Sequence, residues 1–244
     1  MTTAITIEAR VGSTRLPGKV LLPILGKPML ARMIERLGRV ERSDRIVVAT
    51  TESPADDPIV AVAAAEGVEC HRGSEDDVLG RVLGAALFVG ADLIVETTAD
   101  CPLIDPEVVD QVIAAFHANR VDYCANVLEP TYPRGLDVQV FPTAILSKVA
   151  ELTDDPVDRE HVSLYIYQHP ERFRILNVAS GYPAPIGALR WTVDTTEDLA
   201  LVTAIYEELY PGRPDFGWKD VLALLGRRPE LTAINQQVRQ KAVR

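Results

Sequence analysis

Charged and hydroxyl side chains gather between two glycines near the start of the sequence, in ARVGSTRLPGK at residues 9–19. The stretch has the outline of a phosphate-binding loop, in which backbone N–H groups surround phosphate oxygens and cationic side chains neutralise them. The residues that would make these contacts are Arg10, Gly12, Ser13, Arg15 and Lys19. The loop therefore predicts that the chain binds a polyphosphate.

Three architectures could contain such a loop, and the spacing separates them. A Walker A loop places four residues between its glycines and a Ser or Thr after its lysine. Here five residues separate Gly12 from Gly18, and Val20 stands where the hydroxyl would be. The GxGxxG pattern of dinucleotide-binding folds is also absent from this loop. A strand-to-helix turn, in which Gly and Pro only bend the chain, is the alternative to phosphate binding.

Two aspartates stand where a metal ion could be bound. Asp100 follows the apolar strand pattern LIVETT, and Asp194 follows RWTV, which we also predict to be a strand. Open α/β sheets bind ligands at the carboxyl edge of their strands, and Mg²⁺ typically takes one or two carboxylates plus phosphate oxygens and water. The alternative is that both are loop or helix-capping residues, the common role of Asp after a strand.

The first half of the chain alternates between strand and helix patterns. We predict strands at 4–9, 45–51, 68–70 and 92–100, and helices at 28–40, 58–67, 78–90 and 106–120. Asp57-Pro58 and Asp105-Pro106 are expected to begin helices, with Asp as the N-cap and Pro at the first helical position. This alternation predicts an α/β fold with a mostly parallel sheet flanked by helices.

The pattern changes between residues 123 and 185. We expect this segment to be a small inserted α+β lobe, with a strand ending near 141, helices at 143–153 and 159–170, and a strand at 173–179. After it, a strand is expected to end at Asp194, and Thr195 with Asp198 forms a capping-box pattern. Residues 211–244 form a predicted helical tail, so the whole of 1–244 reads as one domain with an inserted lobe.

Composition limits the classes of function. The 244 residues carry a net charge of −10, which argues against nucleic-acid binding and makes the basic loop a focused site on an acidic body. The three cysteines lack metal-site spacing, which indicates reduced thiols. No apolar run approaches the ~20 residues of a membrane span, and the N-terminus does not resemble a signal peptide. We therefore expect a cytoplasmic protein without membrane contact.

Seven stretches, taken together, resemble a known family. In order, they are ARVGSTRLPGKVL, VATTESPADDPI, HRGSEDDVLGR, TTADCPLIDP, YPRGLDVQVF, DREHVSLYI and RWTVDTTEDL. They resemble the cytidylyltransferases that make CMP-activated sugar acids, and more closely the SpsF-like branch named after spore coat polysaccharide biosynthesis. The resemblance implies a nucleotide-diphospho-sugar-transferase fold, CTP as substrate, and Mg²⁺ at Asp100 and Asp194. It also implies catalytic roles for Lys19, Arg10 and Asp100, and nucleotide contacts at Arg72 and Ser74.

The second substrate is expected at a group of charged residues in the second half. They are Tyr132, Arg134, Asp137, Arg159, Glu160, His161 and Arg190. Three arginines near the opening of one binding site would suit an anionic acceptor such as a sugar acid, a phosphate or a phosphonate. The alternative is a surface pair of Arg159 with Glu160 and a structural His161. Thr98 stands where Kdo-activating enzymes carry glutamine, so the acceptor stays open.

The hypothesis from the sequence is a Mg²⁺-dependent, CTP-using cytidylyltransferase that forms a homodimer through the inserted lobe. A nucleotide-sugar-dependent glycosyltransferase of the same fold is one alternative, and the lysine-bearing loop argues against it. A non-catalytic interaction subunit is the other. The presence of Lys19, Asp100 and Asp194 together argues against a subunit that has lost its catalytic activity.

Overall fold

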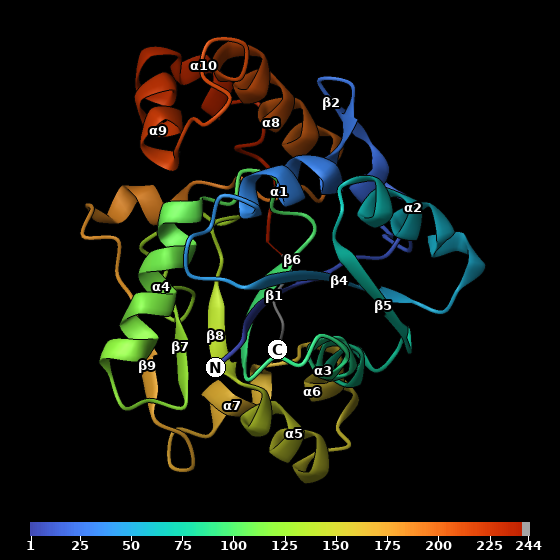
Figure 1. Cartoon of the computed structure of the whole chain (residues 1–244). Coiled ribbons are helices and arrows are strands. Elements are labelled where there is room, and N and C mark those ends of the chain that lie inside the picture. Colours follow the sequence, from blue (N-terminus) through green and yellow to red (C-terminus); the bar gives the residue numbers. More distant parts are fainter. Residues whose placement is uncertain (241–244) are drawn as a thin grey trace.

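A seven-stranded sheet forms the centre of the protein (Figure 1). The computed structural model describes residues 1–240, and of residues 184 and 185 only the backbone. Across the sheet the strands are β5 (Glu69–Gly73), β4 (Arg45–Thr51), β1 (Thr3–Glu8), β6 (Leu93–Thr98), β8 (Gln139–Pro142), β7 (Tyr123–Ala125) and β9 (Ile175–Asn177). Strand β8 runs antiparallel to both of its neighbours, and the other pairings are parallel. The predicted α/β fold with a mostly parallel sheet is confirmed.

Helices cover both faces of this sheet (Figure 1). One face packs against α1 (Met29–Leu37), α2 (Asp57–Ala65), α4 (Pro106–Ala118), α8 (Thr196–Leu209) and α9 (Trp218–Arg227). The other packs against α3 (Val78–Phe88), α5 (Thr143–Leu152) and α7 (Leu164–Gln168), with α6 (Pro156–Glu160) beside α3. In β1, Ile5 and Ile7 join the first core and Ala4 joins the second, because successive strand side chains point to opposite faces.

Two predicted helix starts are confirmed and one is wrong. Asp105 Oδ1 accepts a hydrogen bond from Glu107 N at 2.8 Å, and the Thr195–Asp198 capping box begins α8. The N-cap of α2 is Asp56 rather than Asp57, because a short 3-10 turn, η2 (Pro54–Asp56), precedes the helix. Asp57 lies in the first helical turn, and its carboxylate is 2.7 Å from Arg72 Nη1.

The segment 123–185 extends the central sheet. Its strands β7, β8 and β9 lie in that sheet, while α5 and α6 contact α3. The predicted helix at 159–170 is divided into α6 and α7, because Val162 has a φ of 38°, a left-handed conformation that interrupts an α-helix. Glu160 ends α6, and His161 follows it beside the break.

The predicted strand before Asp194 is absent. Residues 191–194 are irregular, with bends at 192 and 194, and their backbone pairs with loops: Trp191 N donates to Arg134 O at 2.7 Å, and Val193 N donates to Asp100 O at 2.8 Å. Gly135, with a φ of 106°, allows this approach, since a Cβ there would lie 2.7 Å from Thr192 N. Asp194 is thus placed by contacts with loops distant in sequence.

Smaller elements complete the chain. They are a short antiparallel hairpin of β2 (Pro23–Ile24) and β3 (Lys27–Pro28), the 3-10 turns η1 (Lys19–Leu21) and η3 (Ala184–Ala188), and α10 (Pro229–Thr232). Helices α9 and α10 lie within the predicted tail of residues 211–244, whose last four residues, 241–244, lie outside the described part. Within residues 1–240, the helices are too short or too polar to cross a bilayer.

Candidate active site

A cavity of about 450 Å³ opens where β1 and β6 end. Its wall is made by the loop after β1, the turn after β6, the start of α3 and the end of α6. Of the residues predicted from the sequence, those that line it are Arg10, Gly12, Ser13, Arg15, Lys19, Asp100, Glu160, His161 and Asp194. The cavity lies at the carboxyl edge of parallel strands, where α/β sheets bind ligands.

The loop after β1 is closed by its own backbone. Ser13 N and Gly18 N both donate to Val11 O, at 2.7 and 3.0 Å, and Val11 N donates to Asp56 Oδ1 at 2.7 Å. Gly18 has a φ of 69°, which turns the chain so that Lys19 begins the 3-10 turn η1. The loop therefore presents Lys19 to the cavity from a fixed backbone.

Lys19 joins the two aspartates that were predicted as metal ligands. Its Nζ lies 2.9 Å from Asp100 Oδ2, 2.7 Å from Asp194 Oδ1 and 2.9 Å from Val193 O. Each of its three N–H bonds thus has an acceptor. Burial alone would lower the pKa of Lys19, but the two carboxylates outweigh it and hold the pKa above its ordinary value.

Asp194 contacts three cations. Arg15 Nη2 and Arg190 Nη2 lie 2.9 and 2.6 Å from its Oδ2, in addition to Lys19 at Oδ1. Burial would raise the pKa of Asp194, but Lys19, Arg190 and Arg15 together lower it. Arg190 is itself held by Asp198, a fully buried carboxylate 3.0 Å from Arg190 Nε. Asp194 is therefore an ionised carboxylate in a rigid network.

Asp100 has one oxygen on Lys19 and the other, Oδ1, on the Thr98 hydroxyl at 2.6 Å. Two carboxylates on one ammonium are hard oxygen ligands of the kind Mg²⁺ uses. Among residues 1–240 there is no cluster of three or more His, Cys, Asp or Glu side chains that could hold a metal alone. The pair of carboxylates on Lys19 fits a cation that shares its coordination with substrate phosphates, because Mg²⁺ typically takes one or two protein carboxylates there.

Comparison with known proteins places the chain in a family. The family model described as cytidylyltransferase matches residues 4–206. The chain belongs to the cytidylyltransferase family. It is 34% identical to the spore coat polysaccharide biosynthesis protein SpsF of Bacillus subtilis, over 92% of this chain and 94% of that protein. Membership of this family implies nucleotidyltransferase activity.

Solved structures agree with this assignment. A cytidylyltransferase from Leptospira borgpetersenii superposes with a TM-score of 0.91 at 31% identity, covering 99% of this chain and all of that one. A CMP:2-keto-3-deoxy-manno-octonic acid synthetase in complex with CTP superposes with a TM-score of 0.64 at 22% identity, covering 86% of this chain. The second similarity shows that this cytidylyltransferase shares the synthetase fold.

Two predicted nucleotide contacts of this cytidylyltransferase lie outside the cavity lining. The Arg72 guanidinium donates to Thr51 O, Ser53 O and Asp57, which binds it to the end of β4 and the start of α2. The Ser74 hydroxyl accepts from Asp77 N at 3.1 Å. Both side chains therefore have structural partners within the protein, and their nucleotide contacts stay a prediction.

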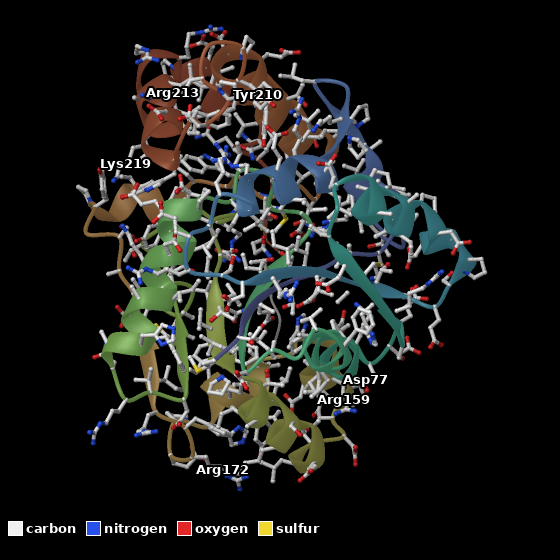
Figure 2. All side chains as sticks on the ribbon, viewed as in Figure 1. Asp77, Arg159, Arg172, Tyr210, Arg213 and Lys219 are labelled. Atoms are coloured by element: carbon white, nitrogen blue, oxygen red, sulfur yellow. The ribbon has the colours of Figure 1, made fainter. Side chains whose placement is uncertain are left out.

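The residues predicted on the acceptor side are dispersed. Glu160 and His161 line the cavity, while Arg159 Nη2 pairs with Asp77 at 2.7 Å (Figure 2). Tyr132 is buried and donates to Gln111 at 3.0 Å. Burial raises the pKa of Asp137 to about 6. Arg134 is exposed, and its backbone pairs with that of Arg190.

Among the lining residues that sequence reasoning did not select, two carry a charge: Glu8 and Arg81. Arg81 is only 3% exposed. The sequence could have indicated Arg81, because it is the one charged residue in the apolar helical stretch VLGRVLGAALF. Charged side chains are rarely fully buried unless they are paired, so a charge in such a helix suggests a specific partner or ligand. Glu8 was not selected because it is the last residue of an apolar strand, and its position gave no sign of a function.

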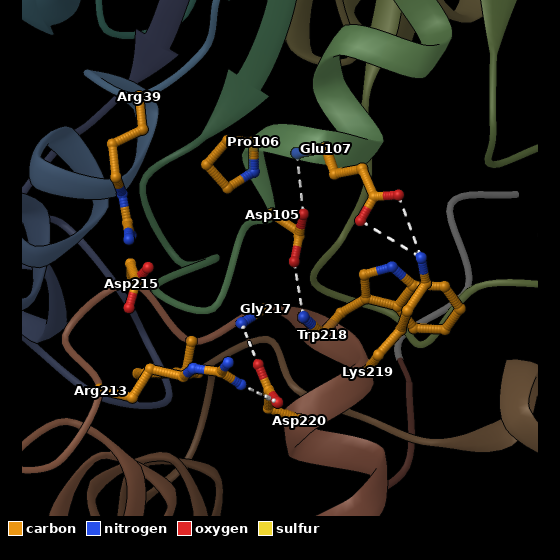
Figure 3. Close-up of a pocket in the computed structure, with 11 residues that line it drawn as sticks. Arg39, Asp105, Pro106, Glu107, Arg213, Asp215, Gly217, Trp218, Lys219 and Asp220 are labelled. Atoms are coloured by element: carbon orange, nitrogen blue, oxygen red, sulfur yellow. Dashed lines mark hydrogen bonds and ion pairs between the residues drawn. The ribbon is translucent and has the colours of Figure 1, made fainter.

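A second hollow of about 480 Å³ lies where α4 and α9 begin (Figure 3). Its charged side chains are largely committed to each other: Lys219 pairs with Glu107 at 3.0 Å, and Arg213 pairs with Asp220 at 2.6 Å. Asp105 accepts from Glu107 N and Trp218 N, which joins the two helix starts. None of the residues predicted to be catalytic or to bind a ligand lines this hollow. We interpret it as a structural contact between the starts of α4 and α9.

Proposed function

We propose that the protein transfers CMP from CTP to a small anionic acceptor and releases pyrophosphate, with Mg²⁺ as cofactor. The observation that carries the proposal is the contact of Lys19 with both Asp100 and Asp194 inside a cavity at the carboxyl edge of the sheet. Family membership supports the reaction type, and the contacts of Lys19 support the assignment of residues to it.

Cationic side chains would hold the triphosphate. Arg10, Arg15 and Lys19 line one cavity together with the backbone of Gly12 and Ser13. Carboxylates pair with two of these cations in the structure, since Arg10 is 3.6 Å from Glu75 and Arg15 is 2.9 Å from Asp194. Phosphate oxygens would replace these partners, because guanidinium and ammonium groups bind phosphate and carboxylate alike.

Release of Lys19 to a phosphate would leave Asp100 and Asp194 as a pair of carboxylates facing the same point. These two would hold Mg²⁺, which neutralises the charge that develops on the α-phosphate and on departing pyrophosphate. Thr98 orients Asp100 through its hydroxyl, and Arg190 orients Asp194 from the side away from Lys19. Catalysis then consists of holding the acceptor oxygen in line with the α-phosphate.

The acceptor would enter beside Glu160 and His161, which line the same cavity. His161 would bind the attacking hydroxyl or accept its proton. The resemblance to SpsF supports a sugar acid used in polysaccharide biosynthesis, with a phosphate or a phosphonate as the other acceptors of the same charge. Formation of a homodimer through residues 123–185 stays part of the proposal, and light scattering would measure it.

A pyrophosphate-release assay tests the function. The protein is incubated with Mg²⁺, one of CTP, UTP, ATP or GTP, and a panel of sugar acids, phosphates and phosphonates. Release from CTP with one acceptor, matched by an equal amount of a CMP conjugate, supports the proposal. Equal release from ATP or GTP contradicts the CTP assignment. Transfer of sugar from a nucleotide sugar, without release of pyrophosphate, would establish the glycosyltransferase alternative.

A further inference from the structure

The segment after α10 reaches back to the support of the candidate active site. Helix α10 packs against α8 and α9 (Figure 1), and its Leu231 joins the first hydrophobic core. Asn235 follows four residues later and is only 5% exposed. The family model matches residues 4–206, so this segment lies beyond the matched part of the chain. Its contacts near the site are therefore a property that family membership does not assign.

The side-chain amide of Asn235 holds the two residues that support Asp194. Its Nδ2 donates to Asp198 Oδ1 at 2.8 Å and to the backbone oxygen of Arg190 at 2.9 Å. Both N–H bonds of the amide are thus used. Asp198 is fully buried, and a buried carboxylate stays charged only where cations and donors meet its oxygens. Asn235 therefore fixes both members of the Arg190–Asp198 ion pair.

This ion pair decides how Arg190 meets Asp194. Arg190 Nε lies 3.0 Å from Asp198 Oδ1, and Arg190 Nη2 lies 3.1 Å from Asp198 Oδ2, which is a bidentate pairing. One N–H of Nη2 then remains for Asp194, and it donates to Oδ2 at 2.6 Å. The other oxygen, Oδ1, contacts Lys19 instead. The pairing with Asp198 thus keeps the guanidinium away from the oxygen that Mg²⁺ would take over from Lys19.

Burial makes this arrangement sensitive to a single donor. Asn235 and Val238 line a small cavity of about 110 Å³, whose lining also includes Arg190 and Trp191. Trp191 is buried, as is Asp198 beneath the segment. Because charges interact more strongly where water is scarce, the direction of the Arg190 guanidinium depends on the few groups that it meets there.

We propose that Asn235 is a positioning residue: it holds the Arg190–Asp198 pair so that one carboxylate oxygen of the cation site stays open. This inference rests on the proposed function, to which the cation belongs. Without the Asn235 amide, the guanidinium can turn a second N–H toward Asp194. A carboxylate bound on both oxygens is a poorer ligand, because the guanidinium and the cation then compete for the same lone pairs.

The test is the gain in CTP affinity that Mn²⁺ gives, measured by calorimetry as the ratio of the dissociation constants without and with the ion. Wild type is expected to gain at least tenfold. Asn235→Leu keeps the bulk of the side chain but has no N–H, and its gain should fall below threefold. Its affinity for CTP without metal should stay within twofold of wild type, because Asn235 does not line the large cavity. Gln237→Met, at an exposed amide of the same segment, is the matched control and should keep the full gain.

Thermal unfolding separates a lost position from a lost fold. If Asn235→Leu is unfolded at the temperature of the titration, Asn235→Ala decides. Its smaller side chain admits water, which can satisfy Arg190 O and Asp198 but does not fix them in place. The Mn²⁺ gain of Asn235→Ala should be less than half that of wild type.

The outcomes distinguish the inference from the proposed function. A folded Asn235 variant that keeps the wild-type gain, or that weakens CTP equally with and without Mn²⁺, overturns the inference and leaves the proposed function standing. Wild type that binds CTP with no gain from Mn²⁺ overturns the metal assignment and the inference with it. Absence of CTP binding to wild type overturns the inference and the proposed function together.

Discussion

Lys19 Nζ lies 2.7 Å from Asp194 Oδ1, and the same ammonium group is 2.9 Å from Asp100. One lysine thus stands between the two carboxylates that we assign to Mg²⁺. Coulomb attraction at such a distance is strong in a partly buried site. A metal ion that arrives alone must displace Lys19 from both carboxylates, whereas a nucleotide offers Lys19 a phosphate in exchange. The relationship makes binding of metal and nucleotide mutually favourable.

The first prediction concerns metal binding without nucleotide. Wild type should bind Mn²⁺ weakly when CTP is absent, and Lys19→Met should bind it at least tenfold more tightly, because the competing ammonium is gone. Titration of free Mn²⁺ by electron paramagnetic resonance measures both. Lys27→Met is the control, since Lys27 is exposed and pairs only loosely, at 3.6 and 3.7 Å, with two glutamates. Equal Mn²⁺ affinity in wild type and Lys19→Met would refute the competition.

The second prediction concerns the support of Asp194. Asp198 is fully buried, and it holds Arg190 and caps α8. Asp198→Asn removes one of the two carboxylates that hold the Arg190 guanidinium, the other being Asp194, and breaking such a buried pair costs roughly 3–5 kcal/mol. Urea unfolding should show this loss in the free energy of unfolding. Asp154→Asn, on an exposed residue, should change it by less than about 0.5 kcal/mol. A loss as small in Asp198→Asn as in the control would contradict the network.

The third prediction concerns Gly135. A Cβ at this position would lie 2.7 Å from the backbone of residues 191 and 192, and its φ of 106° is unfavourable for other residues. Gly135→Ala should lower the free energy of unfolding by roughly 3 kcal/mol or more, because strain and overlap add. Gly181→Ala is the matched control: its φ is 73° but the space is open, so only about 1 kcal/mol is expected. Similar losses in both variants would show that the close approach does not matter.

The fourth prediction concerns pH. The pKa of Glu8 is raised to about 7 and that of Glu96 is raised further, chiefly by burial. In the folded protein this pair keeps protons that the unfolded chain releases above pH 4.5, so the contribution of the pair to stability is largest at low pH and is lost as pH rises toward 7 and above. Glu96→Gln should flatten the dependence of the free energy of unfolding on pH between 5 and 8, measured with urea. An unchanged slope would mean that the pair does not share a proton.

The phosphate loop and the first aspartate could be predicted because their positions depend on local sequence. Strand β1, the glycines and Lys19 are adjacent in the chain, and Asp100 directly follows a strongly apolar strand. The same holds for the helix starts at Asp105 and Thr195, whose caps involve neighbouring residues. Local sequence patterns were therefore sufficient to predict at which edge of the sheet the candidate site lies.

The rest depends on contacts between distant residues. Residues 191–194 are not a sheet strand, because their backbone pairs with loops at 100 and 134 that no local pattern reveals. Arg72 and Arg159 have partners, Asp57 and Asp77, that are 15 and 82 positions away in the chain. A sequence shows that an arginine is present, but not whether its charge is already balanced.

The most direct test of the central claim is calorimetric titration of CTP into the wild-type protein and into Asp100→Asn, with and without Mg²⁺. Wild type should bind CTP more tightly when Mg²⁺ is present, by at least tenfold, because Asp100 and Asp194 then share the ion with the phosphates. Asp100→Asn should lose that Mg²⁺ dependence while unfolding at a temperature close to wild type. Absence of heat with CTP in wild type, or the same Mg²⁺ dependence in Asp100→Asn, would contradict the account.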